Sequence, residues 1–258
     1  MSYKFITVET DGPITTITIN RPEKYNALNI AANRELDEAF DKFESDSSQW
    51  VGIVTGAGEK AFCTGHDLEQ QAEGEGMVVL DRGAAGLTSR FTLNKPLIAA
   101  VNGVAVGGGF EIALACDIIV AAESARFAMP EPKVGLAALA GGTQRLPRMI
   151  GLQRAMGMIL TGRMVKAREG YELGFVTEVT TGPVMDAARR WAEQIAACAP
   201  LAIQASKAAV LHSYCSGLEE DIKGQWHSPT MKTMLDSQDA VEGPKAFVEK
   251  RTPTWVGR

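Results

Sequence analysis

Two glutamates stand in settings that could turn a carboxylate into a proton-transfer group. Glu111 lies in the first turn of an apolar helical segment that carries no other charge before Asp117. A carboxylate among apolar neighbours is costly unless it is satisfied or used in chemistry. Glu131 lies between Pro130 and Pro132. Because the residue before a proline is disfavoured in the α region, we expect Glu131 on extended backbone.

A run of three glycines, residues 107–109, precedes Glu111 at the start of the same predicted helix. Glycine lets the backbone approach a ligand closely, and the first N–H groups of a helix have no partner within it. Those N–H groups and the helix dipole favour an oxygen that carries negative charge. We therefore expect Glu111 and Glu131 to converge beside an oxyanion site. Taken singly, Glu111 could be a dipole-stabilised first-turn acid and Glu131 an ordinary turn acid.

The composition excludes several functional classes. The chain has 258 residues, of which 45% are hydrophobic and 22% charged, as in ordinary globular proteins of one sizeable domain or one domain plus a small one. A net charge of −5 without any block of like charge disfavours nucleic-acid binding. Four cysteines without CxxC spacing and only three histidines disfavour a metal site and a Ser–His–Asp triad. With no signal peptide or membrane-spanning stretch, we expect free thiols and a cytoplasmic protein that binds no membrane.

Hydrophobic periodicity predicts an α/β protein in which strands give way to helices after residue 183. The expected strands are 5–10 and 14–20, which form a hairpin, then 51–55, 97–101, 104–106, 118–121, 126–128 and 175–179. The expected helices are 30–44, capped by Asn29, a segment from residue 144, capped by Thr143, then 152–161, 167–173, 184–198, 201–212, 218–235 and 240–251. Residues 71–85 lack a clear period and fit a mobile surface segment or a helix that shapes a pocket.

Residues 56–61 have the pattern GxGxxA directly after a predicted strand. A dinucleotide-binding fold would need a helix to begin there. Residues 62–67 instead indicate another strand and a loop, so the sequence argues against that fold. We place a boundary near residue 200, because the helical remainder is too small to bury a core alone. Its apolar faces must pack on the first domain or on a neighbouring subunit.

Several motifs in order along nearly the whole chain resemble the crotonase (enoyl-CoA hydratase/isomerase) superfamily. They are the loop 21–29, AFCTGHDL at 61–68, GGGFE at 107–111, Pro130-Glu131, GGTQRL at 141–146 and AFVEKR at 246–251. The resemblance implies a spiral of ββα units over residues 1–200 and a helical C-terminal region over 201–258 that assembles homotrimers or dimers of trimers. It implies an acyl-CoA thioester substrate, with coenzyme A entering only as part of that substrate and no other cofactor.

The resemblance also assigns roles to individual residues. The main-chain N–H groups of His66 and Gly108 would polarise the thioester carbonyl, with Glu131 as the principal proton acceptor and donor and Glu111 positioning water. The residues that would hold the coenzyme A portion are Ala27, Ala61, Gly65, Asp67 and Leu68, together with Phe247 and Lys250 from this or an adjacent subunit. For the last two, the alternative is a helix with Phe247 buried and Lys250 solvated.

The expected activity is addition or removal of water across the 2,3 bond of an enoyl-CoA. Aligned N–H donors stabilise the enolate that forms, and two coupled carboxylates can hold different protonation states. The alternatives are Δ3-Δ2 enoyl-CoA isomerisation by Glu131 alone and a non-catalytic acyl-CoA-binding subunit. Segments 65–68, 85–88, 239–244 and 255–258 also resemble the carnitinyl-CoA dehydratase branch. Two departures affect the acyl group: Ala138-Leu139 replaces the usual Pro-Gly, and His66 replaces a small residue.

Overall fold

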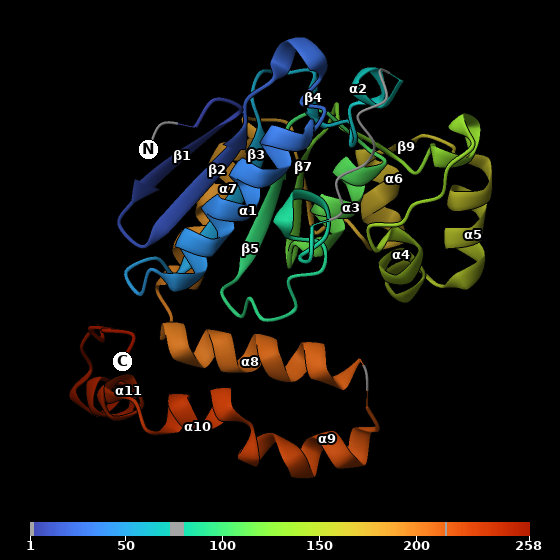
Figure 1. Ribbon diagram of the computed structural model, residues 1–258. Coiled ribbons are helices and arrows are strands. Elements are labelled where there is room, and N and C mark those ends of the chain that lie inside the picture. The colour runs from blue at the N-terminus through green and yellow to red at the C-terminus, as the bar shows by residue number, and fades with distance from the viewer. Residues whose placement is uncertain (1–2, 73–79, 215) are drawn as a thin grey trace.

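The chain is organised around two β-sheets (Figure 1). The computed structural model describes residues 3–72, 80–214 and 216–258. The larger sheet has the strand order β1-β2-β3-β5-β7-β10, and the smaller has the order β4-β6-β8-β9. The strands are β1 Ile6–Asp11, β2 Ile14–Ile19, β3 Val51–Gly56, β4 Ala61–Cys63, β5 Leu97–Val101, β6 Val104–Val106, β7 Ile118–Ala122, β8 Arg126–Ala128, β9 Val165–Lys166 and β10 Glu178–Thr180.

Helices follow successive pairs of strands. They are η1 Pro22–Lys24, α1 Ile30–Ser45, α2 Leu68–Ala72, η2 Ala84–Gly86, α3 Gly108–Ala115, η3 Glu131–Val134, α4 Gly142–Ile150, α5 Leu152–Thr161, α6 Ala167–Leu173, α7 Val184–Ala196, α8 Pro200–Ser213, α9 Leu218–Gly224, η4 Gln225–His227, α10 Pro229–Leu235 and α11 Gln238–Glu249. Each of the pairs β3–β4, β5–β6 and β7–β8 adds one strand to each sheet. The ββα spiral predicted from the resemblance is therefore confirmed.

The central strands of the larger sheet are buried on both faces because their side chains alternate between two cores, whereas the edge strand β1 is mostly exposed. On β3, Ile53 packs with α7, whereas its neighbour Val54 faces the main core. The same alternation places Ile98 of β5 against α7 and Leu97 in the main core. This period of two is the geometry of an extended strand, and it explains why these strands are continuous apolar runs in the sequence.

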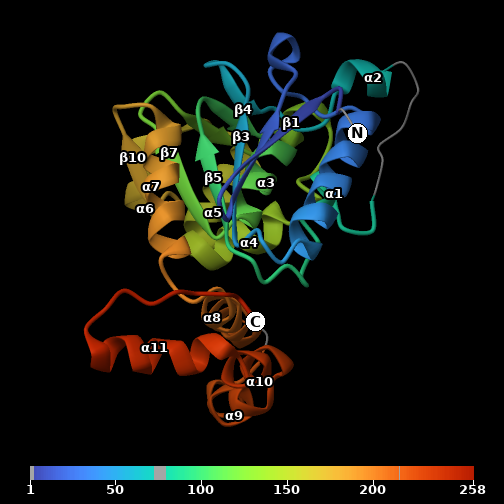
Figure 2. The same ribbon diagram turned by 90° about the vertical axis from the view of Figure 1, so that its left-hand side faces the viewer.

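The C-terminal helices α8–α11 lie together as a separate group below the two sheets (Figures 1 and 2). The predicted helix 218–235 is wrong as a single element, because the chain divides into α9, η4 and α10. Ser228 caps α10 by accepting from the N–H of Met231, and Pro229 occupies the first turn. The Lys207 ammonium on α8 connects this group to the core by donating to Asp117 at 2.7 Å.

Most other predicted elements are confirmed, with three local corrections. Glu131 begins the 3₁₀ helix η3 and is not on extended backbone. Thr143 does not cap α4, which begins at Gly142 after a Gly141 in the left-handed region. The strand predicted at 175–179 is β10, which begins only at Glu178; Phe175, before it, packs its ring on two other phenylalanines in the core.

The GxGxxA segment is a turn between strands, in agreement with the argument against a dinucleotide fold. The Asn26 side chain donates to the carbonyls of Ala57 and Ala61, and the Asn102 side chain donates to those of Gly56 and Gly58. These two asparagine side chains bind the carbonyl groups of the turn. β4 then begins at Ala61, where a dinucleotide-binding fold would place a helix.

Two further expectations concern the whole chain. Cys63, Cys116 and Cys198 are free thiols, and Cys215 lies outside the described residues, as do residues 73–79 of the 71–85 segment. Within the described ranges, no single helix is long and apolar enough to cross a membrane, and the α7–α8 pair that reaches the length together is bent by 104°.

Candidate active site

The segments with the predicted catalytic groups all follow the carboxyl ends of adjacent strands in the smaller sheet. β4, β6 and β8 are parallel neighbours, with Cys63 paired to Ala105 and Val106 paired to Ala128. The chain leaves β4 towards His66, β6 towards Gly108 and Glu111, and β8 towards Glu131. Parallel strands place these three exits at one edge of the sheet, where ligands bind in α/β proteins. The sheet order therefore explains why residues far apart in sequence converge.

Glu111 is a buried acid whose carboxylate is held by a turn from elsewhere in the chain. The residue is 3% exposed, in the first turn of α3. Its Oε1 accepts from the N–H groups of Ala140 at 2.8 Å and Gly142 at 2.9 Å. Burial raises the pKa of Glu111, these two N–H groups oppose the rise, and the nearby Glu131 carboxylate adds to it. Glu111 is thus fixed in place and electrostatically coupled to Glu131.

Glu131 is half-buried, and one of its carboxylate oxygens is unpaired. Oε2 is buried without a hydrogen-bond partner among the described residues. Oε1 lies beside Gly107, only 3.1 Å from the position that a Cβ would take there. Burial raises the pKa of Glu131. A partly desolvated carboxyl group with one unpaired oxygen is suited to take up and release a proton.

The main chain supplies two N–H groups at the same edge. Gly65 and Gly108 approach so closely that a Cβ on Gly65, whose φ is +82°, would lie 2.7 Å from the Gly108 nitrogen. The Gly65 carbonyl and the Asp67 N–H both bond Leu28, whereas the intervening N–H of His66 has no acceptor in the described part of the chain. The N–H of Gly108, at the start of α3, also has none there. Two adjacent unpaired donors can bind one negatively charged oxygen.

The His66 side chain is half-buried, and its Nε2 has no hydrogen-bond partner within the described ranges. Desolvation lowers the pKa of His66, so its imidazole is neutral at pH 7. A neutral ring can present Nε2 as either a donor or an acceptor, depending on the tautomer. The ring therefore adds a polar group near the two main-chain donors.

The loop residues predicted to hold coenzyme A are brought together by a side chain to which the sequence analysis gave no role. Arg21 forms a buried ion pair of 3.0 Å with Asp67 and also donates to the carbonyl of Ala27. This guanidinium joins the loop after β2 to the loop after β4. A buried arginine before a proline, facing a lone aspartate, carries no local pattern that would reveal this pairing.

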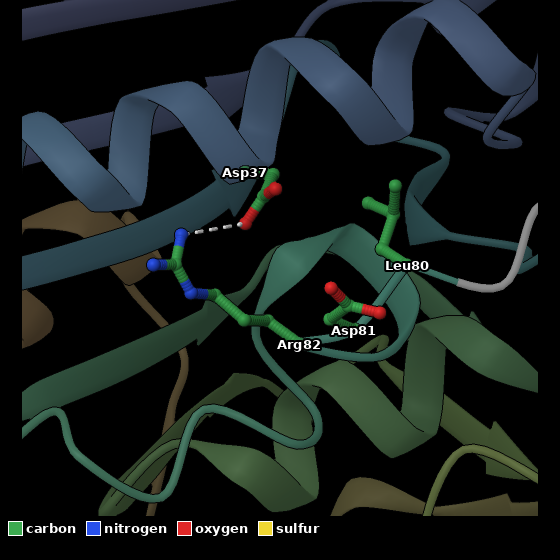
Figure 3. A pocket seen from close by; sticks show the side chains of 4 residues that line it. All are labelled: Asp37, Leu80, Asp81 and Arg82. Carbon is green, nitrogen blue, oxygen red and sulfur yellow. Dashed lines mark ion pairs between the residues drawn. The ribbon is translucent and has the colours of Figure 1, made fainter.

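An apolar pocket of about 350 Å³ opens between α2 and the end of η3. Its lining residues are Leu68, Ala72, Val134 and Leu136. Leu68 is among the residues predicted for coenzyme A binding, and Val134 lies three residues after Glu131. A second pocket, of about 420 Å³, lies beside α1 and is lined by Asp37, Leu80, Asp81 and Arg82 (Figure 3). None of the predicted site residues lines this second pocket.

Phe247 and Lys250 are not brought to this site within one chain. Both lie at the end of α11, which Figures 1 and 2 place below the sheets and away from α3. Phe247 is 84% exposed and Lys250 is solvated, so the phenylalanine is not buried within a single chain. A role for either residue in binding would require a neighbouring subunit.

Comparisons with known proteins agree along nearly the full length. A family model described as Enoyl-CoA hydratase/isomerase matches residues 9–258. A carnitinyl-CoA dehydratase from Proteus mirabilis is 44% identical over 256 residues, which cover 96% of this chain and 97% of that protein. One from Salmonella paratyphi A is 44% identical over 254 residues, with the same coverage of each chain. A solved enoyl-CoA hydratase from Mycobacterium tuberculosis is 41% identical and superposes with a TM-score of 0.92, covering 98% of this chain and 99% of its own.

Sequence and structure thus give the same relationship by separate routes. The family model covers all the segments that carry the two acids and the two main-chain donors. The structural likeness extends over both sheets and the C-terminal helices, since the superposition covers 98% of the chain. The chain belongs to the enoyl-CoA hydratase/isomerase family.

Proposed function

We propose that the protein adds water to, or removes it from, the 2,3 bond of an acyl-CoA thioester, with no cofactor beyond the coenzyme A of the substrate. The observation that carries this proposal is the pairing of two coupled acids, Glu111 and Glu131, with two unpaired main-chain donors at one sheet edge. Hydration needs both an activated water and a proton donor, and it develops negative charge on the thioester oxygen. The relatives' names support the same reaction class.

In the hydration direction, a water oxygen forms a bond to C3 as the C2–C3 π electrons move towards the thioester oxygen. The N–H groups of His66 and Gly108 stabilise that oxygen, and losing one such donor typically costs about 3 kcal/mol of transition-state stabilisation. Glu131 is the principal proton acceptor and donor. Glu131 accepts the proton that the water loses and donates the proton that C2 gains. Glu111 positions the water and helps to activate it. Dehydration is the reverse.

The central test is turnover of crotonyl-CoA by the purified protein, followed as loss of the enoyl-thioester absorbance. Glu111→Ala separates hydration from the isomerase alternative, in which Glu131 acts alone. Hydration requires Glu111, so we expect turnover to fall at least 100-fold. If Glu111→Ala keeps most of its activity on a 3-enoyl-CoA but not on crotonyl-CoA, isomerisation is favoured. Thioester binding without turnover of any substrate in a panel would favour a non-catalytic subunit.

A second candidate is dehydration of carnitinyl-CoA, favoured by the 44% identity with carnitinyl-CoA dehydratases. The pocket lined by Leu68, Ala72, Val134 and Leu136 is aliphatic, which suits an apolar acyl group better than a quaternary ammonium. Comparing kcat/KM for carnitinyl-CoA with that for 3-hydroxybutyryl-CoA distinguishes the two. A ratio above one would assign the protein to the carnitinyl reaction.

We also propose a homotrimer or a dimer of trimers. The C-terminal helices expose large apolar side chains that water does not favour, including Leu218, Val241, Phe247 and Val248 at 70–84% exposure. Assembly would cover this surface and would allow Phe247 and Lys250 of one subunit to contact the coenzyme A portion bound by the next. Light scattering coupled to size-exclusion chromatography tests the mass, and a monomer at micromolar concentration would contradict the assembly.

A further inference from the structure

Arg145, a residue of the first turn of α4, lies against the turn that holds Glu111. Its guanidinium donates to the carbonyl of Thr88 at 2.8 Å and stacks on the Phe91 ring at 5.8 Å from the centroid. A Cβ on Gly141 would collide with Nη1 of Arg145, so the guanidinium packs directly on that glycine. The Arg145 main-chain N–H also donates to the Gly141 carbonyl at 2.8 Å. Arg145 therefore braces Gly141 with both its side chain and its backbone.

Gly141 is the residue between the two N–H donors of Glu111. Those donors belong to Ala140 and Gly142, and both bond the same oxygen, Oε1. Gly141 has a φ of +98°, a backbone conformation that residues other than glycine rarely adopt. If the turn at Gly141 moved, both donors would move with it. The bracing of Gly141 thus fixes the direction of the Glu111 carboxylate and leaves Oε2 without a protein partner among the described residues.

The segment that carries Thr88 is itself held against α1. Arg90, whose side chain is 0% exposed, forms ion pairs with Asp37, Asp41 and Glu44 of α1 and donates to the Gly86 carbonyl. Arg82, at the start of the same segment, pairs with Asp37 as well (Figure 3). The segment 82–90 is therefore a fixed support, and Arg145 transmits its position to the Gly141 turn.

We propose that Arg145 is a positioning residue for Glu111, holding the 140–142 turn so that one carboxylate oxygen is locked and the other faces the substrate and water. This inference rests on the proposed function. Four further groups act on Glu111 or Arg145: Glu131 from η3, the N–H groups of Ala140 and Gly142, and Cys116 at the end of α3. Burial raises the pKa of the Cys116 thiol, which keeps it neutral.

The charge of Arg145 adds an electrostatic effect to the geometry. Burial raises the pKa of Glu111 most, Glu131 raises it further, and the Arg145 guanidinium lowers it. Removing the guanidinium should therefore raise the pKa of Glu111 and reduce its ionised fraction near neutral pH. The acid limb of the activity profile then moves to higher pH if the ionised form of Glu111 is required.

The experiment compares Arg145→Met with Arg148→Met on crotonyl-CoA. Arg148 lies three residues later on α4, is exposed and donates only within its own helix. Because misplacing a catalytic group by about 1 Å can cost about 100-fold, we expect Arg145→Met to lower kcat by about that factor with little change in KM, and to move the acid limb upward. Arg148→Met should match the wild type. Arg145→Lys, which keeps the charge but loses the planar fork, should keep the acid limb and recover part of kcat.

Three outcomes would overturn the proposal. One is a folded Arg145→Met with wild-type kcat and pH profile, and another is a lower melting temperature with an unchanged pH profile and kcat. The third applies if Arg145→Met fails to fold: a wild-type kcat in Arg145→Lys would then overturn the proposal. If the wild type turns over no enoyl-CoA, the proposed function fails, and Arg145 is tested separately by NMR titration of ¹³C-labelled Glu111. The electrostatic role is then rejected if the pKa of Glu111 is the same in the wild type and in Arg145→Met. It is also rejected if that pKa is the same in Arg145→Lys and in Arg145→Met.

Discussion

Replacing Glu131 with glutamine separates its catalytic role from its cost to the fold. Glutamine has nearly the same shape but cannot exchange a proton, so we expect kcat on crotonyl-CoA to fall by about 100-fold to 10,000-fold. Glu131 Oε2 is buried and unpaired, and an amide placed there would also leave one polar atom unpaired. Where the wild-type acid is protonated, the two proteins should therefore have equal free energies of unfolding within about 1 kcal/mol.

At higher pH the stabilities should diverge in favour of the variant. Burial raises the pKa of Glu131 in the folded chain above its value in the unfolded chain, which is about 4.3. The stability that Glu131 contributes is therefore fully present below the unfolded pKa and is lost as pH rises through the folded pKa. Glutamine does not titrate, so the difference in unfolding free energy between variant and wild type should grow with pH, by at most about 1.4 kcal/mol per pH unit.

The assay is urea unfolding of both proteins at several pH values from 4 to 8, together with turnover at each pH. Glu123→Gln, an exposed glutamate on the turn after β7, is the control for the substitution itself and should retain wild-type turnover. Full turnover by Glu131→Gln would refute the catalytic assignment. A stability difference that stays flat or falls with pH would refute the argument from burial.

Three other changes test the scaffold and the assembly. Gly109→Ala should lower the melting temperature sharply or prevent folding, because the added Cβ would lie 2.5 Å from the carbonyl carbon of Cys63, and a wild-type melting curve would contradict this packing. Arg90→Met removes the buried partner of three α1 carboxylates, and we expect a loss of about 3 kcal/mol in urea unfolding, the low end for such pairs because the carboxylates are partly exposed. Phe247→Asp should reduce the assembly to monomers in light scattering and raise KM, whereas an unchanged mass would place the interface elsewhere.

Elements with a local cause were predictable from the sequence. Asn29 was expected to cap the first helix, and its side chain accepts from the N–H of Ala32. The hairpin around Gly12 follows from turn chemistry, and the full burial of β3 and β5 follows from their continuous apolar runs. Even the break between α9 and α10 had a local signal, Ser228 followed by Pro229, which the helical pattern of 218–235 obscured.

Features that depend on partners distant in sequence were not predictable in this way. Thr143 was expected to cap α4, but the N–H of Gly142 donates to Glu111 from another helix, so no local cap is needed. Glu131 was expected on extended backbone, yet it begins a 3₁₀ turn whose start follows the end of β8. Arg21 and Arg145 lie in segments that carry the family resemblance, but nothing local reveals their contacts, because their partners lie 46 and 57 residues away.

The sequence by itself determined the two acids, the glycine run and the family, because residue type and spacing along the chain carry that information directly. Only the tertiary structure decided which oxygen of Glu111 is held, that Glu131 keeps an unpaired oxygen, and that Arg145 supports the turn between the two donors. The physical reason is that β4, β6 and β8 pair side by side. Hydrogen bonds and desolvation act over a few ångströms in space, so they depend on that pairing and not on separation in the sequence.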